Sequence, residues 1–90
     1  MAKTQYNVND VVYAIDTYHY DDKSPNSYKQ DFHRIVKCIV VSIWINSDNS
    51  IEYNLKDIKE NYEWGESIKE IEVFKHINDA LAHFIKLCKL

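Results

Sequence analysis

Histidine and aspartate side chains gather between residues 17 and 34, and these are side-chain types that bind metal ions. His19, Asp21, Asp22 and His33 fall within this connector and could converge across it. However, none of the four histidines forms a His-x-x-x-His pair, and the two cysteines lack the spacing of a zinc site. The sequence therefore favours ordinary surface histidines, and it predicts no metal and no cofactor.

The patterns that mark an enzyme are missing from the sequence. There is no Gly-x-Ser-x-Gly motif, and the single glycine, Gly65, excludes a glycine-rich phosphate loop. Cys38 and Cys88 lie inside apolar patterns, which predicts small buried side chains with reduced thiols rather than a disulfide or a nucleophile. A carboxylic general acid needs an apolar pocket, for which 90 residues leave little volume. We expect no enzymatic activity.

Aromatic residues in and beside the loops suggest a binding role instead. Tyrosine and tryptophan offer large, rigid contact area with a polar tip that tolerates water. We therefore predict that the 17–34 connector is a recognition loop, with the acidic 57–72 segment as a second candidate surface. The predicted partner-binding residues are Tyr18, His19, Tyr20, Tyr28, Phe32, Tyr62 and Trp64. Some of these rings are expected to fold back into the core, with Phe32 and Trp64 foremost.

Two alternative functions remain open at this point. A small barrel can bind single-stranded nucleic acid by stacking bases on exposed aromatic rings beside a basic groove. The formal net charge of −3 argues against this function, and the connector's aspartates offset its basic residues. The other alternative is a homo-oligomer that sequesters a small ligand at its seam. A host protein is the first expectation for the partner.

The elements that must position these residues are mostly strands. Residues 10–18 and 33–45 are rich in β-branched and aromatic types, which pack well on a pleated sheet. In 33–45, Ile35, Ile39, Val41, Ile43 and Ile45 are predicted on one side, and Val36, Cys38, Val40 and Trp44 on the other. A strand this long in a small domain must bend or contain a bulge. The turn formers at 46–50 join it to residues 50–56, where Ile51, Tyr53 and Leu55 should face inward, and so predict a β-hairpin.

The C-terminal third is predicted to hold a loop, a strand and a helix. Residues 57–67 suggest a loop or a short helical turn, and 67–74 a fourth strand with Ile71 and Val73 on one face. Apolar side chains at helical spacing follow, and we expect this stripe to close the core, with a partner-binding face as the alternative. The stripe comprises Ile77, Leu81, Phe84, Ile85 and Cys88.

The predicted fold is therefore α+β and mainly β, in one domain over residues 1–90. It is a small, strongly bent antiparallel sheet or an SH3-like barrel of four to five strands with a C-terminal amphipathic helix. The N-terminus, MAKTQYNVND, lacks the apolar region of a signal peptide, and no apolar run is long enough to span a membrane. We expect a cytoplasmic protein.

Four segments of the chain, VNDVVYAID, SIEYNL, EIEVF and NDALAHF, carry a family resemblance. The chain resembles short phage- and prophage-encoded proteins from AT-rich bacteria, which open with a Gly-Asp-x-Val strand and close with Glu-x-Glu-Val-Phe before a helix. Asn9-Asp10 stands here in place of Gly-Asp, and Asn78 to Leu81 replace the block that starts the helix. The resemblance implies an SH3-like fold and a host-interacting protein, such as an inhibitor of an anti-phage defence protein. It carries over no functional residues.

Overall fold

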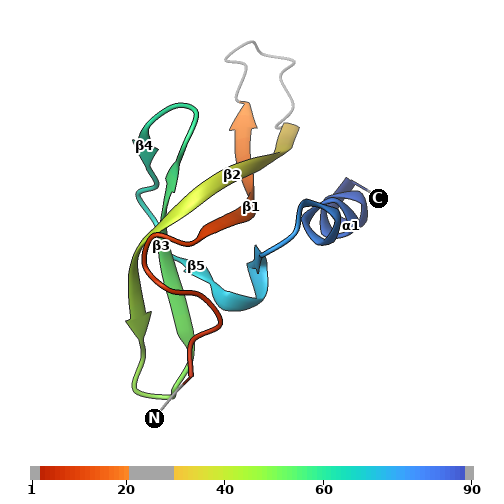
Figure 1. Ribbon diagram of the computed structural model, residues 1–90. Coiled ribbons are helices and arrows are strands. Elements are labelled where there is room, and N and C mark those ends of the chain that lie inside the picture. The colour runs from red at the N-terminus through yellow and green to blue at the C-terminus, as the bar shows by residue number, and fades with distance from the viewer. Residues whose placement is uncertain (1–2, 21–29, 89–90) are drawn as a thin grey trace.

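In the part of the chain that the structure describes, a bent β-sheet is followed by an α-helix at the C-terminal end (Figure 1). The computed structural model describes residues 3–20 and 30–88, with the side chains of 3–17 and 33–88. Its elements in chain order are β1 (Val11–Tyr20), β2 (Gln30–Ile45), β3 (Ile51–Asp57), β4 (Tyr62–Glu63), β5 (Ile68–Lys69), the 3-10 helix η1 (Glu70–Glu72), β6 (Val73–Phe74) and α1 (Ile77–Cys88).

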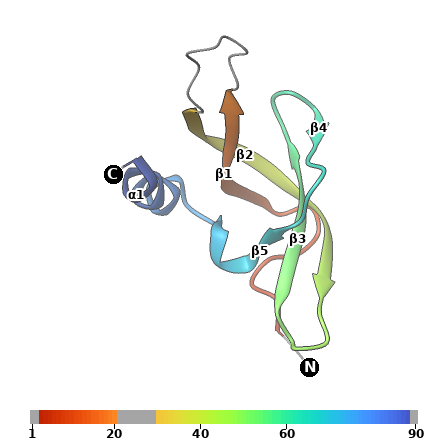
Figure 2. The same ribbon diagram turned by 180° about the vertical axis from the view of Figure 1, so that it is seen from behind.

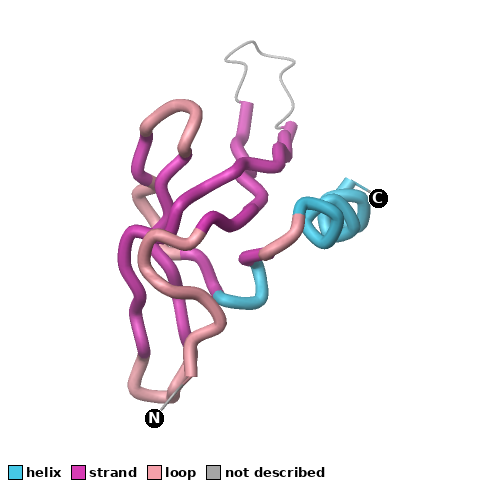
Figure 3. The backbone as a smooth tube through the Cα atoms, viewed as in Figure 1, coloured by secondary structure: helices cyan, strands magenta, loops and turns pink. Residues whose placement is uncertain are grey.

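All strand pairs of the sheet are antiparallel, and the order is β4-β3-β2-β1-β6, with β5 also pairing with β3. The chain passes from β5 at one edge, through η1, to β6 at the opposite edge, as Figure 3 shows. The sheet is strongly bent without closing into a barrel, which confirms the first of the two predicted forms. The described residues form six strands, more than the predicted four to five, and three of these strands hold only two residues each.

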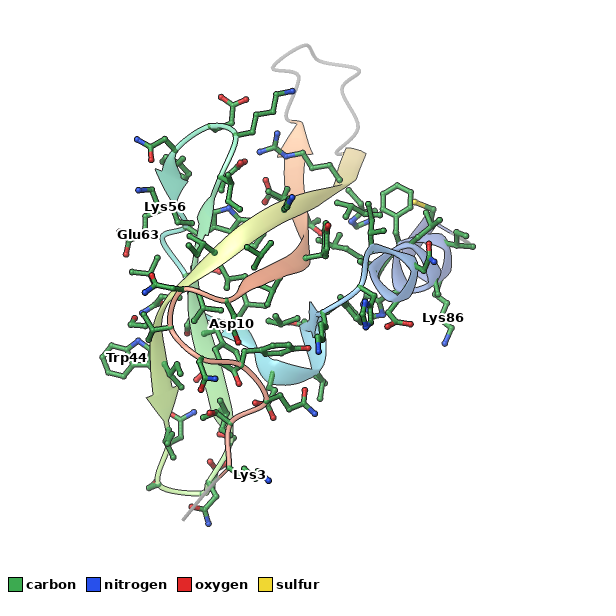
Figure 4. All side chains as sticks on the ribbon, viewed as in Figure 1. Lys3, Asp10, Trp44, Lys56, Glu63 and Lys86 are labelled. Atoms are coloured by element: carbon green, nitrogen blue, oxygen red, sulfur yellow. The ribbon has the colours of Figure 1, made fainter. Side chains whose placement is uncertain are left out.

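The predicted bulge lies in β2, where the pairing with β3 shifts between Val40 and Ser42. Val40 pairs with Leu55, whereas Ile43 pairs with Tyr53, so the extra residue reverses which side chains face inward. The predicted faces of 33–45 are therefore wrong beyond the bulge. Ile43 packs against the core, and Trp44 lies on the outer face with 58% of its surface exposed (Figure 4).

The core fills the inner face of the bend. As predicted, Ile51, Tyr53 and Leu55 of β3 face inward. They pack with buried side chains of β1, β2 and β6 and with Tyr6 from the N-terminal segment. Among the side chains that the structure describes, the buried hydrophobic ones are Tyr6, Val12, Ala14, Val36, Cys38, Val40, Ile51, Tyr53, Leu55, Val73 and Ala80. The opposite face of β1 is less covered, since Val11 is exposed.

A tight turn at Asn9 and Asp10 leads the chain into β1. Asn9 has a φ of 76°, in the left-handed region that glycine and asparagine tolerate best. Its N–H donates to the carbonyl of Val40, 2.8 Å away, and the Val40 N–H donates to the carbonyl of Asp10 at 2.9 Å. These two hydrogen bonds dock the turn onto β2 beside the bulge.

The segment from 57 to 74 differs from its prediction in two places: the predicted loop contains a short strand, and the predicted strand is interrupted. The predicted loop contains β4, because Asp57 accepts the backbone N–H groups of Lys59 and Glu60 and so turns the chain back onto β3. The predicted continuous fourth strand is wrong, because η1 interrupts it. Ile71 is 82% exposed, whereas Val73 is 4% exposed, so the two do not share a buried face.

Helix α1 forms as predicted, but it packs on a different face. Ala80 is buried, and His83 and Phe84 are half-buried, whereas Ile77, Leu81, Ile85 and Cys88 of the predicted stripe are exposed. The helix follows β6 and contacts β1, β2 and β6 through this other face, so the predicted apolar stripe does not close the core. Both cysteines were predicted to be buried. Cys38 is buried, whereas Cys88 is exposed, and neither forms a disulfide. No helix in the described part of the chain is long and apolar enough to cross a membrane.

Candidate functional site: an acidic and aromatic cleft

A cleft of about 470 Å³ opens beside β1. Figure 2 shows β1 lying between α1 on one side and β4 on the other. The cleft combines residues from β1, the 62–68 segment, η1 and α1, and is thus built by elements far apart in the sequence. Its lining residues are Ile15, Asp16, Thr17, Tyr62, Trp64, Gly65, Glu66, Ile68, Glu72, His83 and Leu87.

The pleat of β1 divides the cleft into two sides. Asp16 is on the same face of the strand as the buried Ala14, and this is the face toward the core. Ile15 and Thr17 are on the opposite face. Tyr13 shares that face and pairs with Phe74, whose ring lies 5.5 Å from the ring of His83 in α1. One side of the cleft therefore faces the bend of the sheet, and the other faces α1.

The aromatic wall comes from the segment after β3. The backbone N–H of Trp64 donates to the carbonyl of Leu55, 2.9 Å away, and the half-buried Trp64 ring packs against the core. The hydroxyl of Ser67 donates to Glu52 at 3.0 Å, which ties the end of the segment to β3. Tyr62 is 64% exposed. One ring is thus fixed by the core, and the other is available to solvent.

Three carboxylates, Asp16, Glu66 and Glu72, line the cleft, and none of the described residues that line it is a lysine or arginine. The only arginine of the chain, Arg34, is opposite Asp16 on β2, and its Nε lies 3.2 Å from the Asp16 carboxylate. Glu66 and Glu72 form no ion pair with any residue that the structure describes. The cleft is therefore negatively charged, and it suits a cationic ligand better than an anionic one.

The histidines give the cleft no metal-binding cluster within the described ranges. His33 shares a 2.8 Å hydrogen bond with the hydroxyl of Thr17, its partner across the β1–β2 pair. His83 lines the cleft against Phe74, on the side of α1. Across residues 3–20 and 30–88, no three histidine, cysteine or acidic side chains gather as metal ligands would.

The predicted site residues divide into two groups. Tyr62 and Trp64 both line the cleft, and Trp64 also packs against the core as expected. Tyr18, His19 and Tyr20 belong to β1, where Tyr18 is opposite Phe32 of β2, but the side chains of all four are outside the described part. Tyr28 lies outside the described residues, as do Asp21 and Asp22. The predicted 17–34 connector is thus strand at both ends, consistent with its aromatic and β-branched residues.

Several cleft residues were not predicted from the sequence. Asp16 and Ile15 were assigned to a strand, and His83 carried no recognisable motif. Glu66 and Glu72 belong to the acidic 57–72 segment, which was the one available signal. The exposed Trp44 was also missed, because its outward position depends on the bulge.

Comparisons of the chain with protein-family models, with curated proteins and with solved structures find no match. The functional argument therefore depends on the chemistry of the cleft.

Proposed function

We propose that the chain is a non-enzymatic protein-binding module that holds a basic segment of a partner protein in the cleft. The observation that carries this proposal is the described lining, which holds three carboxylates and two aromatic rings and no lysine or arginine. Carboxylates pair with lysine and arginine, and the faces of tyrosine and tryptophan rings attract the same cations. Aromatic residues are also the usual anchors of protein interfaces.

The charge of the cleft weighs against the nucleic-acid alternative. A protein that binds single strands aligns basic side chains with the phosphates, and carboxylates in that position would repel them. The small-ligand alternative has no comparable support, because the cleft is open and lies within one chain. A basic protein segment is therefore the better-supported ligand.

A narrower part of the proposal comes from the family resemblance. In this proposal the protein is a phage-encoded inhibitor whose partner is a host anti-phage defence protein, and its expected location is the bacterial cytoplasm. The partner should then present a lysine- or arginine-rich surface, because that is what the cleft would bind.

Quantitative affinity capture from bacterial lysate, followed by reconstitution with the purified partner, tests the proposal. The double variant Glu66→Lys/Glu72→Lys reverses two charges in the cleft and should reduce capture at least tenfold. The matched control Glu60→Lys/Glu63→Lys changes the net charge equally but outside the cleft lining. It should retain binding. Equal capture by both double variants would show that the cleft is not the binding site.

A further inference from the structure

β1 has an open edge where it borders the cleft. All ten of its residues pair with β2 on one side. On its other side, the described pairs with β6 are limited to Tyr13 and Ala14. From Ile15 to Tyr20, no described strand pairs with that edge, which is about 20 Å long at 3.3 Å per residue. Every second residue along such an edge directs its N–H and C=O groups outward.

This open edge lies at the cleft rather than on a bare surface. Ile15, Asp16 and Thr17 are the residues immediately after the β6 pairing, and all three line the cleft. An exposed strand edge is a template for another strand, and proteins use it to bind extended peptides. The cleft thus offers backbone hydrogen bonds as well as charge.

We propose that the cleft binds its partner by β-strand addition, with an extended basic segment pairing along β1 from Ile15 onward. This inference rests on the proposed function and specifies its binding mode. Successive side chains of an added strand point to opposite faces. Those on one face meet Asp16 and Trp64, those on the other meet Ile15 and Leu87, and Glu66 and Glu72 line the same cleft. The favoured segment therefore alternates basic and apolar residues.

Charge selects a foreign segment over a second copy of the chain. Two copies joined edge to edge at β1 would bring two sets of the same carboxylates together, and like charges at a strand pair destabilise it. A basic strand instead neutralises them. A partner with alternating lysine and apolar residues is therefore the occupant that fits.

N-methyl scanning of a short capped peptide of alternating lysine and valine tests this binding mode by isothermal titration calorimetry. N-methylation removes one backbone donor and leaves the side chains in place. We expect at least tenfold weaker binding when every second position is methylated, and little change at the positions between. A matched peptide of alternating glutamate and valine should not bind.

Each other outcome overturns strand addition in a recognisable way. Equal tolerance of methylation at all positions would show docking by side chains alone, and the proposed function would survive. Failure of the unmodified lysine–valine peptide to bind at millimolar concentration would exclude this mode, whereas the lysate capture decides the proposed function independently. A dimer in light scattering that the peptide dissociates would assign the edge to a second copy.

Discussion

The ring of Tyr6 packs edge-on against the ring of Tyr53, with centroids 5.4 Å apart and planes at 71°. The Tyr6 backbone N–H donates to the Tyr53 hydroxyl at 3.3 Å, and that hydroxyl donates to the Glu70 carboxylate. The Tyr6 hydroxyl in turn donates to the carbonyl of Val73, 3.1 Å away. The two rings thus join the N-terminal segment to β3, η1 and β6.

Replacing Tyr53 by phenylalanine should remove the centre of this network while keeping the ring. Because the buried Tyr6 N–H loses its acceptor, we expect the free energy of unfolding to fall by about 1–2 kcal/mol. Urea denaturation measures the change. The control Tyr62→Phe alters an exposed hydroxyl and should stay within about 0.5 kcal/mol of the unsubstituted protein. An unchanged midpoint for Tyr53→Phe would show that the network adds nothing to stability.

The same tyrosine should make stability fall at high pH. Burial raises the pKa of Tyr53 from its ordinary 10.0 to about 12, and hydrogen bonding to Glu70 adds to the shift. Burial likewise raises the pKa of the Cys38 thiol from 9.0 to about 12. The unfolded chain loses these protons first, so the stabilisation is complete below about pH 9 and is lost as pH rises toward 12.

Denaturant midpoints measured from neutral pH upward test that dependence. The unsubstituted protein should show a steady fall above about pH 9. Tyr53→Phe should show a shallower fall, because among the described side chains only Cys38 and Tyr6 then retain raised pKa values. Identical slopes in the two proteins would contradict the role given to Tyr53.

The parts of the fold that depend on residue patterns within one strand or helix were predictable from the sequence. Alternation in 51–55 is enough to place Tyr53 and Leu55 in the core, because adjacent side chains of a strand face opposite ways. The position of the bulge was not predictable, since Val41 resembles its neighbours and only pairing with β3 selects it. The prediction that the apolar stripe of α1 faces the core was wrong for a related reason. An apolar periodicity marks a helix without showing which face the sheet will contact, and here that face centres on Ala80.

The cleft was less predictable than the fold. Tyr62 and Trp64 stood out by residue type, but Asp16 and His83 are 67 positions apart and line the same cleft only because β6 returns to β1. Long-range pairing of this kind leaves no signal in a single sequence. The acidic 57–72 segment pointed toward Glu66 and Glu72, yet a charged run by itself indicates no more than a solvated face.

Asn9 is the turn residue whose substitution should matter most for its backbone conformation. A β-branched side chain is strained at a φ of 76°, so Asn9→Val should destabilise the protein by about 1–2 kcal/mol. Asn9→Gly should stay within about 0.5 kcal/mol of the unsubstituted protein, because glycine adopts this conformation freely. Asn7→Val, a nearby exposed asparagine without positive φ, is the matched control. Equal losses for both valine variants in thermal unfolding would refute the conformational explanation.

The two thiols should differ sharply in reactivity. The thiolate is the reactive form, and the buried Cys38, with its pKa near 12, holds almost none at neutral pH. Cys88 is exposed. A disulfide-exchange reagent should therefore modify one thiol rapidly in the folded protein and both after unfolding. Cys88→Ser should abolish the rapid phase, and a rapid phase that persists in this variant would place Cys38 within reach of solvent.

Gly65 lines the cleft without needing to be glycine. It has no positive φ, and a Cβ built at this position meets no atom within 4 Å. Gly65→Ala should therefore stabilise the protein by about 0.4–1 kcal/mol, because alanine lowers the conformational entropy of the unfolded chain. Urea denaturation measures the gain, and Asn9→Ala, which places a Cβ at a positive φ, should move the midpoint in the opposite direction. A loss of stability in Gly65→Ala would mean that the segment carrying Trp64 requires backbone freedom that only glycine supplies.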